Sequence, residues 1–359
     1  MNVKLSEEHN KLIEDIALRQ GLSNFDLETN SGSIKGDGYL GIITTADIKN
    51  GKNKLNLILK SAQDNEELRK MAPVRDIYLR EIYLYNKIFP EFDKFQRENG
   101  LLNGFSGHAK IYGSCDKQNE ECLVLENLRE IGYKLWNRKV PMNSEHVGLV
   151  FAEYGKFHAI SLAMNTKEPE MYKKLSENLG NVFKNSAANG LLQKMQQFVL
   201  ENGFKAVKGN NLATHALEKF SVNLEGFLND DLEVFEDQLV ITHGDCWCNN
   251  MMFKYENTQD IATPTKVCFL DWQLARTGSP VLDLLLEYHW KKYSKFGLFM
   301  SLMVIKIMLS EADEVPDLGA TAESGRDFVD EISYDFVNVN DYNQRIVDIV
   351  TFMAEHKLI

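Results

Sequence analysis

The stretch 243–250, which reads His-Gly-Asp-Cys-Trp-Cys-Asn-Asn, constrains the fold more than any other feature of the chain. It directly follows the apolar segment 238–242, and a second apolar segment, 266–270, leads into Asp271. Short apolar runs bounded by polar residues are typical of buried strands, and functional groups often follow such strands. The sequence therefore predicts a small β patch with a group of polar side chains at its end.

Asp245, Asn250 and Asp271 are the residue types that phosphoryl transfer to a hydroxyl requires. The transfer needs a carboxylate beside the acceptor proton and oxygen ligands for a metal ion that bridges the phosphates. Asp245 suits the first role, and Asn250 and Asp271 suit the second. The spacing His-x-Asp-x-x-x-x-Asn with a later strand-borne Asp is that of kinase catalytic loops. The alternative is a polar hairpin without chemistry, which explains the tripeptide but not the whole combination.

His243, Cys246 and Cys248 raise a zinc-site alternative in the same loop. A structural zinc site usually takes its four ligands as two separated pairs. The tight His-x-x-Cys-x-Cys cluster lacks the second pair, so we interpret both cysteines as small loop residues.

A glycine motif stands where a phosphate-binding loop is expected. Gly36, Gly38 and Gly41 form Gly-x-Gly-x-x-Gly ahead of two extended runs, 42–48 and 54–60, which an Asn-Gly pair predicts to form a hairpin. Glycines let backbone N–H groups approach phosphate oxygens. The motif alone also fits an ordinary turn, and the downstream acidic residues favour the phosphate-binding interpretation.

Lys60 closes the second strand of this hairpin, where a kinase lysine contacts the α- and β-phosphates. The segment 66–89 has helical spacing, and Pro90 is predicted to end that helix. Glu81 lies on it and could pair with Lys60. The order of glycine loop, strand lysine and helix glutamate is that of a nucleotide site, although either residue could simply be solvated.

Glu126, Asn127 and Leu128 follow the apolar run 121–125 and mark the exit from a small α+β unit. Their backbone is the natural hinge for the adenine edge of ATP, and the alternative is a simple turn between lobes. We expect an α+β fold with an antiparallel-sheet N-lobe, residues 1–127. A large helical C-lobe, residues 128–359, is expected to carry the catalytic loop and the acceptor pocket.

The C-lobe sequence favours a small acceptor over a peptide. Residues 144–237 read almost entirely as helix and could wall off a small-molecule pocket. Asp271 is followed after only twelve residues by Asp283, which leaves no room for the activation segment of a protein kinase. Asp283 could accept hydrogen bonds from the catalytic loop or cap the following helix.

The charge balance argues against polyanionic partners. The chain has 40 Lys and Arg residues against 52 Asp and Glu residues, a net charge of -12 with both signs interspersed. Such a field repels nucleic acid and anionic lipid, so we expect neither nucleic acid nor membrane as a partner. It also repels ATP, so a nucleotide site must supply lysine, backbone N–H groups and a divalent metal.

The cysteines and the absence of a predicted membrane segment favour the cytoplasm. Five cysteines, an odd number at irregular spacing, cannot pair completely within one chain. Residues 1–20 lack the apolar core of a signal peptide. The longest apolar run, 297–309, contains Lys306 and is shorter than the roughly 20 residues that span a bilayer, so it is predicted to be a buried helix.

Taken with these residues, the chain resembles the ecdysteroid kinase-like family, also called CHK kinase-like, within the aminoglycoside phosphotransferase and choline kinase group. The resemblance runs from the glycine loop to about residue 290. It rests on Gly36 to Gly41, Tyr78-x-x-Glu81-x-x-x-Tyr85 with Phe89-Pro90, Leu123 to Leu128, Lys156-Phe157-His158-Ala159, His243 to Phe253, and Leu270 to Asp283.

The resemblance implies a protein-kinase-like bilobal fold that uses ATP and Mg²⁺ to phosphorylate hydroxyls of small, often lipophilic alcohols such as ecdysteroids. It makes Asp245 the catalytic base, Asn250 and Asp271 the metal ligands, Lys60 the phosphate contact and Glu81 its partner. The family hinge usually reads Leu-Glu-Asp-Leu, which differs here at one residue, and Leu and Val are common where this catalytic loop has its two cysteines. None of these departures removes a group that the chemistry needs.

Two other functions stay open from sequence. The same chemistry could act on choline, ethanolamine or an aminoglycoside, which the acidic balance of the chain mildly favours. A pseudokinase could bind nucleotide or a lipophilic ligand without transfer, although all the residues needed for transfer are present. Competition between the two acceptor classes would separate a cationic acceptor from a lipophilic alcohol. ATP binding without turnover would indicate a pseudokinase.

Overall fold

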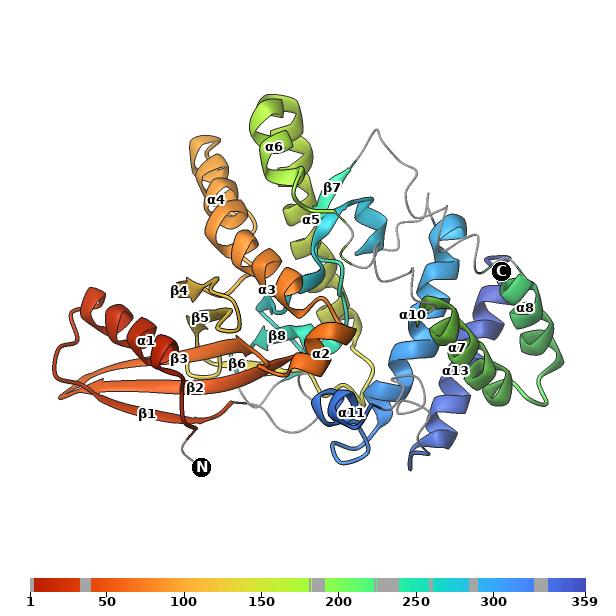
Figure 1. Ribbon diagram of the computed structural model, residues 1–359. Coiled ribbons are helices and arrows are strands. Elements are labelled where there is room, and N and C mark those ends of the chain that lie inside the picture. Colours follow the sequence, from red (N-terminus) through yellow and green to blue (C-terminus); the bar gives the residue numbers. More distant parts are fainter. Residues whose placement is uncertain are drawn as a thin grey trace.

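The chain folds as an α+β protein, as the sequence predicts. A computed structural model describes residues 3–32, 40–180, 182, 191–222, 224, 239–257, 261–283, 290–325 and 335–359. Five of the ten described strands form one sheet within residues 26–126, and helices dominate the described part of the remainder (Figure 1).

The N-terminal part is built on a five-stranded antiparallel sheet. In order across the sheet, the strands are β1 (Asp26–Ser31), β2 (Gly41–Asn50), β3 (Asn53–Ala62), β5 (Cys122–Glu126) and β4 (Ile111–Cys115). β2 and β3 form the predicted hairpin, and Gly51 takes the positive φ of 57° that suits its tight turn. β1 is not predicted, because its polar sequence lacks apolar alternation.

Helix α1 (Glu7–Arg19) covers one face of this sheet. Its buried Ile13 shares a core cluster with Leu57 and Leu59 of β3. Because side chains alternate between the two faces along a strand, Lys60 points to the opposite face. Helix α1 therefore covers the face of β3 that lacks Lys60, and the face with Lys60 is available to later parts of the chain.

Three helices follow β3. They are α2 (Glu66–Met71), α3 (Val74–Tyr83) and α4 (Phe89–Glu98), with a π-helical turn (Leu84–Ile88) between the last two. The prediction that Pro90 ends this helical segment is wrong. Pro90 lies in the first turn of α4, where its missing N–H is not needed, and the π-helical turn shifts the hydrogen-bond register just before it.

A buried carboxylate ties two of these helices to the sheet. Glu121 precedes β5 and its side chain has no exposed surface. It accepts hydrogen bonds from Arg69 Nη2 of α2 at 2.9 Å and from Arg75 Nη1 of α3 at 2.6 Å. Glu121 therefore helps to hold α3, the helix that carries Glu81, against the sheet.

We expect Glu121→Gln to lower the free energy of unfolding by about 3 kcal/mol at pH 7, because the neutral amide leaves both guanidinium groups without a counter-charge. Burial opposes the shift, but hydrogen bonds from the arginines hold the pKa of Glu121 below its ordinary value of 4.5. Its stabilisation is thus present above pH 4.5 and is lost as the pH falls through the lowered pKa. Urea unfolding of both proteins between pH 7 and pH 4 checks this. A difference that stayed constant below pH 4.5 would contradict it.

The C-terminal part is mostly helical, with two small β elements. Its described helices are α5 (Ser144–Lys167), α6 (Pro169–Ser176), α7 (Leu191–Ala206), α8 (Asn211–Val222), α10 (Trp290–Leu309), α11 (Leu318–Ser324) and α13 (Val339–Glu355). Its described strands are β6 (Tyr133–Leu135), β7 (Val240–Thr242), β8 (Met251–Lys254), β9 (Lys266–Phe269) and β10 (Arg276–Gly278).

The predicted β patch is present, with two additional strands. The predicted apolar segments 238–242 and 266–270 contain β7 and β9, and a third apolar segment that the sequence indicates, 250–253, overlaps β8. β8 pairs with both β9 and β6, and β7 pairs with β10. The predicted helical stretch 144–237 contains α5 to α8, while residues 225–237 lie outside the described part of the chain.

A buried aromatic cluster joins the N-terminal helices to the β patch. The Trp272 ring centroid lies 4.9 Å from that of Phe89 on α4 and 5.0 Å from that of Phe157 on α5. Helices α7, α8, α10 and α13 lie together (Figure 1), and their apolar side chains form a second core. Within the described residues, no helix is long and apolar enough to cross a membrane.

Candidate active site

Lys60, Glu81 and Asp271 meet at one point, although they come from β3, α3 and the turn that follows β9. Lys60 Nζ lies 2.6 Å from Glu81 Oε2 and 2.9 Å from Asp271 Oδ1. Burial alone would lower the pKa of Lys60, but the carboxylates of Asp271 and Glu81 outweigh it and raise the pKa above its ordinary value. The amine is therefore charged at neutral pH.

The backbone around Asp271 fixes this cluster. Asp271 has φ 62° and ψ 69°, a left-handed conformation that few residues other than glycine adopt. The next residue, Trp272, donates its backbone N–H to Glu81 Oε1 at 3.2 Å. Glu81 thus accepts a hydrogen bond from Lys60 on Oε2 and one from the backbone of Trp272 on Oε1. These two bonds link α3 to β3 and to the turn that follows β9. Backbone strain of this kind is concentrated at functional sites.

Asp245 and Asn250 form the second half of the site. The side-chain nitrogen of Asn250, Nδ2, donates to Asp245 Oδ2 at 2.8 Å and to the Asp245 carbonyl at 3.1 Å. The backbone N–H of Leu270 donates to the Asn250 carbonyl at 2.8 Å, which places the loop beside Asp271. Burial, followed by the nearby negative charge of Asp271, raises the pKa of Asp245 to about 7.

The donor set at Asn250 and Asp271 fits a magnesium ion. Since the nitrogen of Asn250 is used by Asp245, its side-chain oxygen is the group left for another partner. The Asp271 side chain is 35% exposed, and its Oδ1 pairs with Lys60. Carboxylate and amide oxygens are the ligands that Mg²⁺ prefers in proteins, usually together with substrate phosphates.

Asp283 holds the loop that carries Asp245. Its carboxylate is fully buried and accepts from the backbone N–H groups of His243 at 2.7 Å and Gly244 at 2.9 Å, and from Cys246 Sγ at 3.0 Å. His158 Nε2 of α5 completes the set at 2.8 Å. Burial opposes ionisation, but the His158 hydrogen bond and charge keep the pKa of Asp283 below its ordinary value.

Gly244 is required for this arrangement. Its φ is +80°, and a Cβ at this position would overlap the backbone carbonyl of Leu274. The loop can therefore turn tightly toward Asp245 only with glycine here.

Sequence alone leaves the role of Asp283 open between capping a helix and holding the loop. The structure shows it holding the loop, and it adds His158 as a partner that spacing does not reveal. The available signal for His158 is its place in the Lys156-Phe157-His158-Ala159 motif. Partners 125 residues apart can be joined only by the tertiary fold.

We expect Asp283→Asn to lower the melting temperature by about 5 °C, because one amide cannot accept from four donors and its NH₂ group must face at least one of them. Thermal unfolding of the two proteins measures the shift. The exposed Asp76 of α3 offers a matched control, for which Asp76→Asn should shift the melting temperature by no more than about 1 °C. Equal melting temperatures for the wild-type protein and Asp283→Asn would contradict the anchoring role.

The predicted hinge residues lie where β5 ends. Glu126 is the last residue of β5, and Asn127 and Leu128 are buried. Asn127 Oδ1 accepts from the Arg129 N–H at 3.2 Å, and the Leu128 carbonyl accepts from the Tyr133 N–H at 3.0 Å. The Asn127 side chain thus closes the turn locally, and contact of these residues with adenine stays a prediction.

Only part of the predicted glycine loop is described. Gly36 and Gly38 lie outside the described residues, whereas Gly41 opens β2. A Cβ at Gly41 would overlap the hydroxyl of Tyr78, which donates to the Ser61 carbonyl at 2.9 Å. The glycine therefore lets α3 pack closely on the strand end next to Lys60, and its contact with phosphate stays a prediction.

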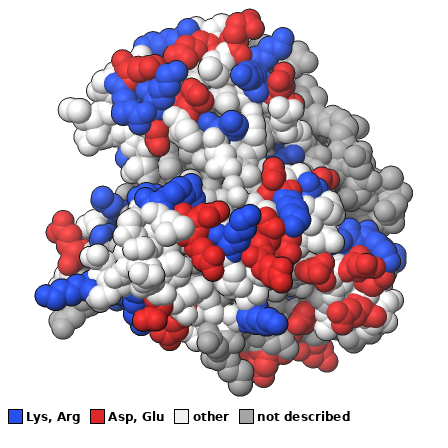
Figure 2. All heavy atoms as spheres, turned by 60° about the vertical axis from the view of Figure 1, so that its left-hand side comes forward, with Lys and Arg blue, Asp and Glu red and all other residues white. Residues whose placement is uncertain are grey.

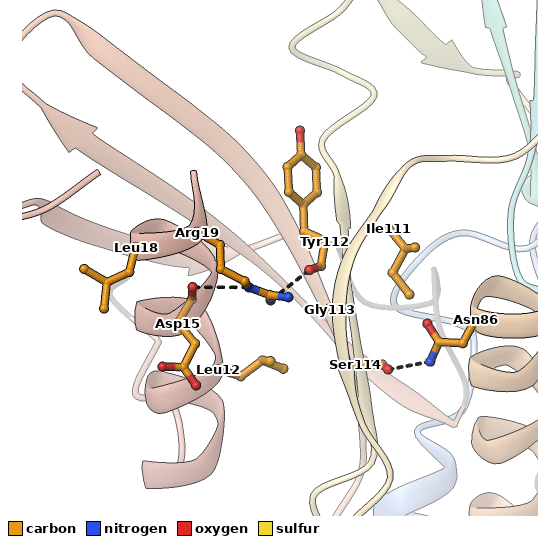
Figure 3. Close-up of a pocket in the computed structure, with 9 residues that line it drawn as sticks. All are labelled: Leu12, Asp15, Leu18, Arg19, Asn86, Ile111, Tyr112, Gly113 and Ser114. Carbon is orange, nitrogen blue, oxygen red and sulfur yellow. Dashed lines mark hydrogen bonds between the residues drawn. The ribbon is translucent and has the colours of Figure 1, made fainter. Parts of the chain in front are cut away.

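A pocket of about 730 Å³ lies elsewhere, between α1, β4 and the π-helical turn (Figure 3). Two hydrogen bonds join its lining residues: Arg19 donates to the Tyr112 carbonyl at 3.1 Å, and Asn86 donates to Ser114 Oγ at 2.8 Å. Its lining shares no residue with the Lys60, Glu81 and Asp271 cluster. The convergence of charged side chains, rather than this groove, therefore identifies the candidate active site.

Surface charge is mixed on the face that Figure 2 shows. Lys and Arg side chains lie among Asp and Glu side chains there, in agreement with the interspersed charges of the sequence. On the part of that face that the structure describes, no broad basic stripe of the kind that tracks a nucleic acid backbone is visible.

Comparisons with known proteins give a family and two distant structural neighbours. Residues 35–287 match the ecdysteroid kinase-like family. A search of curated proteins gave no match. Spectinomycin phosphotransferase in complex with ADP and spectinomycin aligns with a TM-score of 0.42 and 10% identity over 96% of this chain and 98% of its own. A mutant aminoglycoside 2′-phosphotransferase in complex with GDP aligns with a TM-score of 0.39 and 9% identity over 98% of this chain and 97% of its own.

Proposed function

Because the chain belongs to the ecdysteroid kinase-like family, we propose that it transfers the γ-phosphate of ATP, with Mg²⁺, to a hydroxyl of a small lipophilic alcohol such as an ecdysteroid. Membership makes it a small-molecule phosphotransferase of the protein-kinase-like fold. The nucleotide, the metal, the alcohol acceptor and the roles of individual residues are our proposal.

One observation carries the proposal. Lys60, Glu81 and Asp271 form a single charged cluster, with Asp245 and Asn250 on the adjoining loop. The five residues come from β3, α3, the catalytic loop and the turn after β9, so only the fold brings them together. A charged lysine beside carboxylate and amide oxygens is the set of groups that positions and neutralises triphosphate.

In this proposal each side chain has one task. Lys60 contacts the α- and β-phosphates, and Glu81 fixes its position. Asn250 and Asp271 would hold Mg²⁺, which would supply positive charge to neutralise the phosphates. The acceptor hydroxyl loses its proton to Asp245 as its oxygen bonds to the γ-phosphorus, and the bond to the departing ADP oxygen breaks.

The raised pKa of Asp245 suits a base near neutral pH. A carboxylate of ordinary acidity would be a weaker acceptor for the hydroxyl proton, whereas one with a pKa of about 7 is better matched. The hydrogen bond from Asn250 holds Oδ2 and so fixes the orientation of the carboxylate.

We also propose the division of labour between two lobes. Residues 1–127 would form the N-lobe, with Gly36, Gly38 and Gly41 over the phosphates. Residues 128–359 would form the C-lobe with the catalytic loop and acceptor pocket. Backbone groups of Glu126, Asn127 and Leu128 would face the adenine at the junction. Five free cysteines suit a reducing compartment, and we propose the cytoplasm.

A comparison of acceptor classes tests this proposal. The full chain with MgATP is offered ecdysone, estradiol, choline, ethanolamine and kanamycin separately, and initial rates give kcat/KM for each. We expect phosphorylated product from the neutral ring-bearing alcohols at a kcat/KM at least about tenfold above that of any cation. Preference for choline, ethanolamine or kanamycin would replace the lipophilic acceptor with a cationic one.

A further inference from the structure

We propose that Trp247 forms one wall of the acceptor subsite and that its indole packs on the ring framework of a neutral alcohol held at Asp245. This proposal rests on the proposed function and extends it to the side chain that selects the acceptor. Its basis is the geometry of the catalytic loop.

Two side chains of the loop, those of Cys246 and Cys248, face the protein interior. Cys246 donates its thiol to the buried Asp283 at 3.0 Å, and Cys248 is only 9% exposed. Asp245 and Trp247, together with Cys246, are half-buried, so each keeps some exposed surface. Trp247 has extended backbone angles, φ -127° and ψ 163°, where the chain enters the short 3₁₀ turn Cys248–Asn250. The indole of Trp247 is the large apolar side chain of this loop that keeps exposed surface.

Backbone hydrogen bonds hold Trp247 in this position. Its N–H donates to the Asp245 carbonyl at 3.1 Å, and its own carbonyl accepts from the Asn250 N–H at 3.0 Å. The carboxylate of Asp245 also interacts with the indole of Trp247, which acts with Asn250 to oppose the rise in the pKa of Asp245. The indole thus lies within reach of the proposed base.

Trp247 differs from other tryptophans of the chain in its packing. Trp272 is fully buried among aromatic rings, and Trp136 packs on His146 with ring centroids 4.4 Å apart. Among the described residues, Trp247 belongs to none of the three apolar clusters, although its neighbour Cys246 does. A large, half-buried indole on this loop offers apolar area to a ligand instead of to the core.

The position of the indole also indicates the class of acceptor. A hydroxyl that gives its proton to Asp245 must lie about 2.6–3.2 Å from the carboxylate, so the adjoining carbon framework must pass beside Trp247. The flat indole face offers apolar area that a ring-bearing alcohol can bury, which favours such an alcohol over a small, mostly polar acceptor.

The test separates acceptor binding from nucleotide binding and from turnover. Calorimetry with ecdysone and estradiol gives Kd for the full-length wild-type protein, Trp247→Ala, Trp247→Phe and the control Trp136→Ala, each saturated with a non-hydrolysable MgATP analogue. Steady-state rates give KM for the same alcohols and for ATP. Trp247→Phe keeps an aromatic ring and so serves as the conservative rescue.

We expect Trp247→Ala to raise Kd and KM for the alcohol roughly 10- to 50-fold, the cost of removing a central aromatic contact. Trp247→Phe should raise them by no more than about threefold, and KM for ATP should stay within about twofold in both. Trp136→Ala should leave all these constants within about twofold of the wild-type values.

Three results would overturn the proposal. They are an unchanged alcohol Kd in Trp247→Ala, equal losses of alcohol and ATP binding, and no binding of either alcohol to the wild-type protein. Binding that depends on Trp247 without any transfer would support the subsite and count against the kinase reaction. Phosphate transfer to an alcohol with an unchanged alcohol KM in Trp247→Ala would support the kinase reaction and count against the subsite.

Discussion

The substitution Asp245→Asn is expected to lower the rate of phosphate transfer about 10³-fold while the Kd for MgATP stays within about threefold. The amide cannot accept the hydroxyl proton, but it has nearly the same shape and can still bond to Asn250. Lys60, Glu81 and Asp271 do not depend on the lost proton acceptor, so the nucleotide contacts should remain. Initial rates and calorimetry on the two proteins measure both quantities.

The matched control for this substitution is Asp15→Asn, at an exposed position of α1. It should leave the transfer rate unchanged within about twofold. If Asp245→Asn turned over at the wild-type rate, Asp245 would not be the base. A parallel loss of ATP binding would indicate instead that the substitution had disrupted the site.

Asp271→Ala is expected to weaken ATP binding about 30-fold in Mg²⁺ but by no more than about threefold in EDTA, because the lost group acts through the metal. It should also reduce transfer to background. Lys60 keeps its partner Glu81 at 2.6 Å in this variant, so the strand end should stay in place. Calorimetric titrations with and without Mg²⁺ provide the comparison.

Equal losses of affinity in Mg²⁺ and in EDTA would show that Asp271 acts through Lys60 and not through a metal. Asp271→Asn separates the two possibilities further, since it keeps an oxygen ligand but removes the charge that faces Lys60. We expect an intermediate loss of affinity in Mg²⁺ for that variant.

Much of the architecture follows from local sequence patterns. The Asn-Gly pair predicts the β2–β3 hairpin, and the apolar runs before the catalytic loop and before Asp271 predict β7 and β9. These elements are specified by residues close together in the chain, which is why their positions can be anticipated. The α+β class and the order of sheet and helices were predicted for the same reason.

The features that sequence did not predict depend on distant partners or on weak local signals. Proline breaks most helices. Here the π-helical turn that precedes Pro90 lets the helical segment continue into α4. β1 is a polar edge strand that forms by pairing with β2. β10 has three residues and pairs with β7, from which it is more than 30 residues distant. No short window of sequence contains both partners.

The candidate site shows the same division. Residue type and spacing were sufficient to choose Lys60, Glu81 and Asp271, and the structure brings these three together within hydrogen-bond distances. The four donors on Asp283 could not be read from spacing, because they depend on how the loop turns over Gly244.

The most direct measurement of the central claim is the mass of the product formed from ¹⁸O-labelled γ-phosphate ATP, MgCl₂ and ecdysone or estradiol, with the wild-type protein and Asp245→Asn side by side. The account predicts an alcohol that carries one labelled phosphoryl group in the wild-type reaction and none above background in the variant. A wild-type protein that binds MgATP but leaves both alcohols and the cationic acceptors unlabelled would contradict it. A labelled product formed equally by both proteins would remove Asp245 from the chemistry.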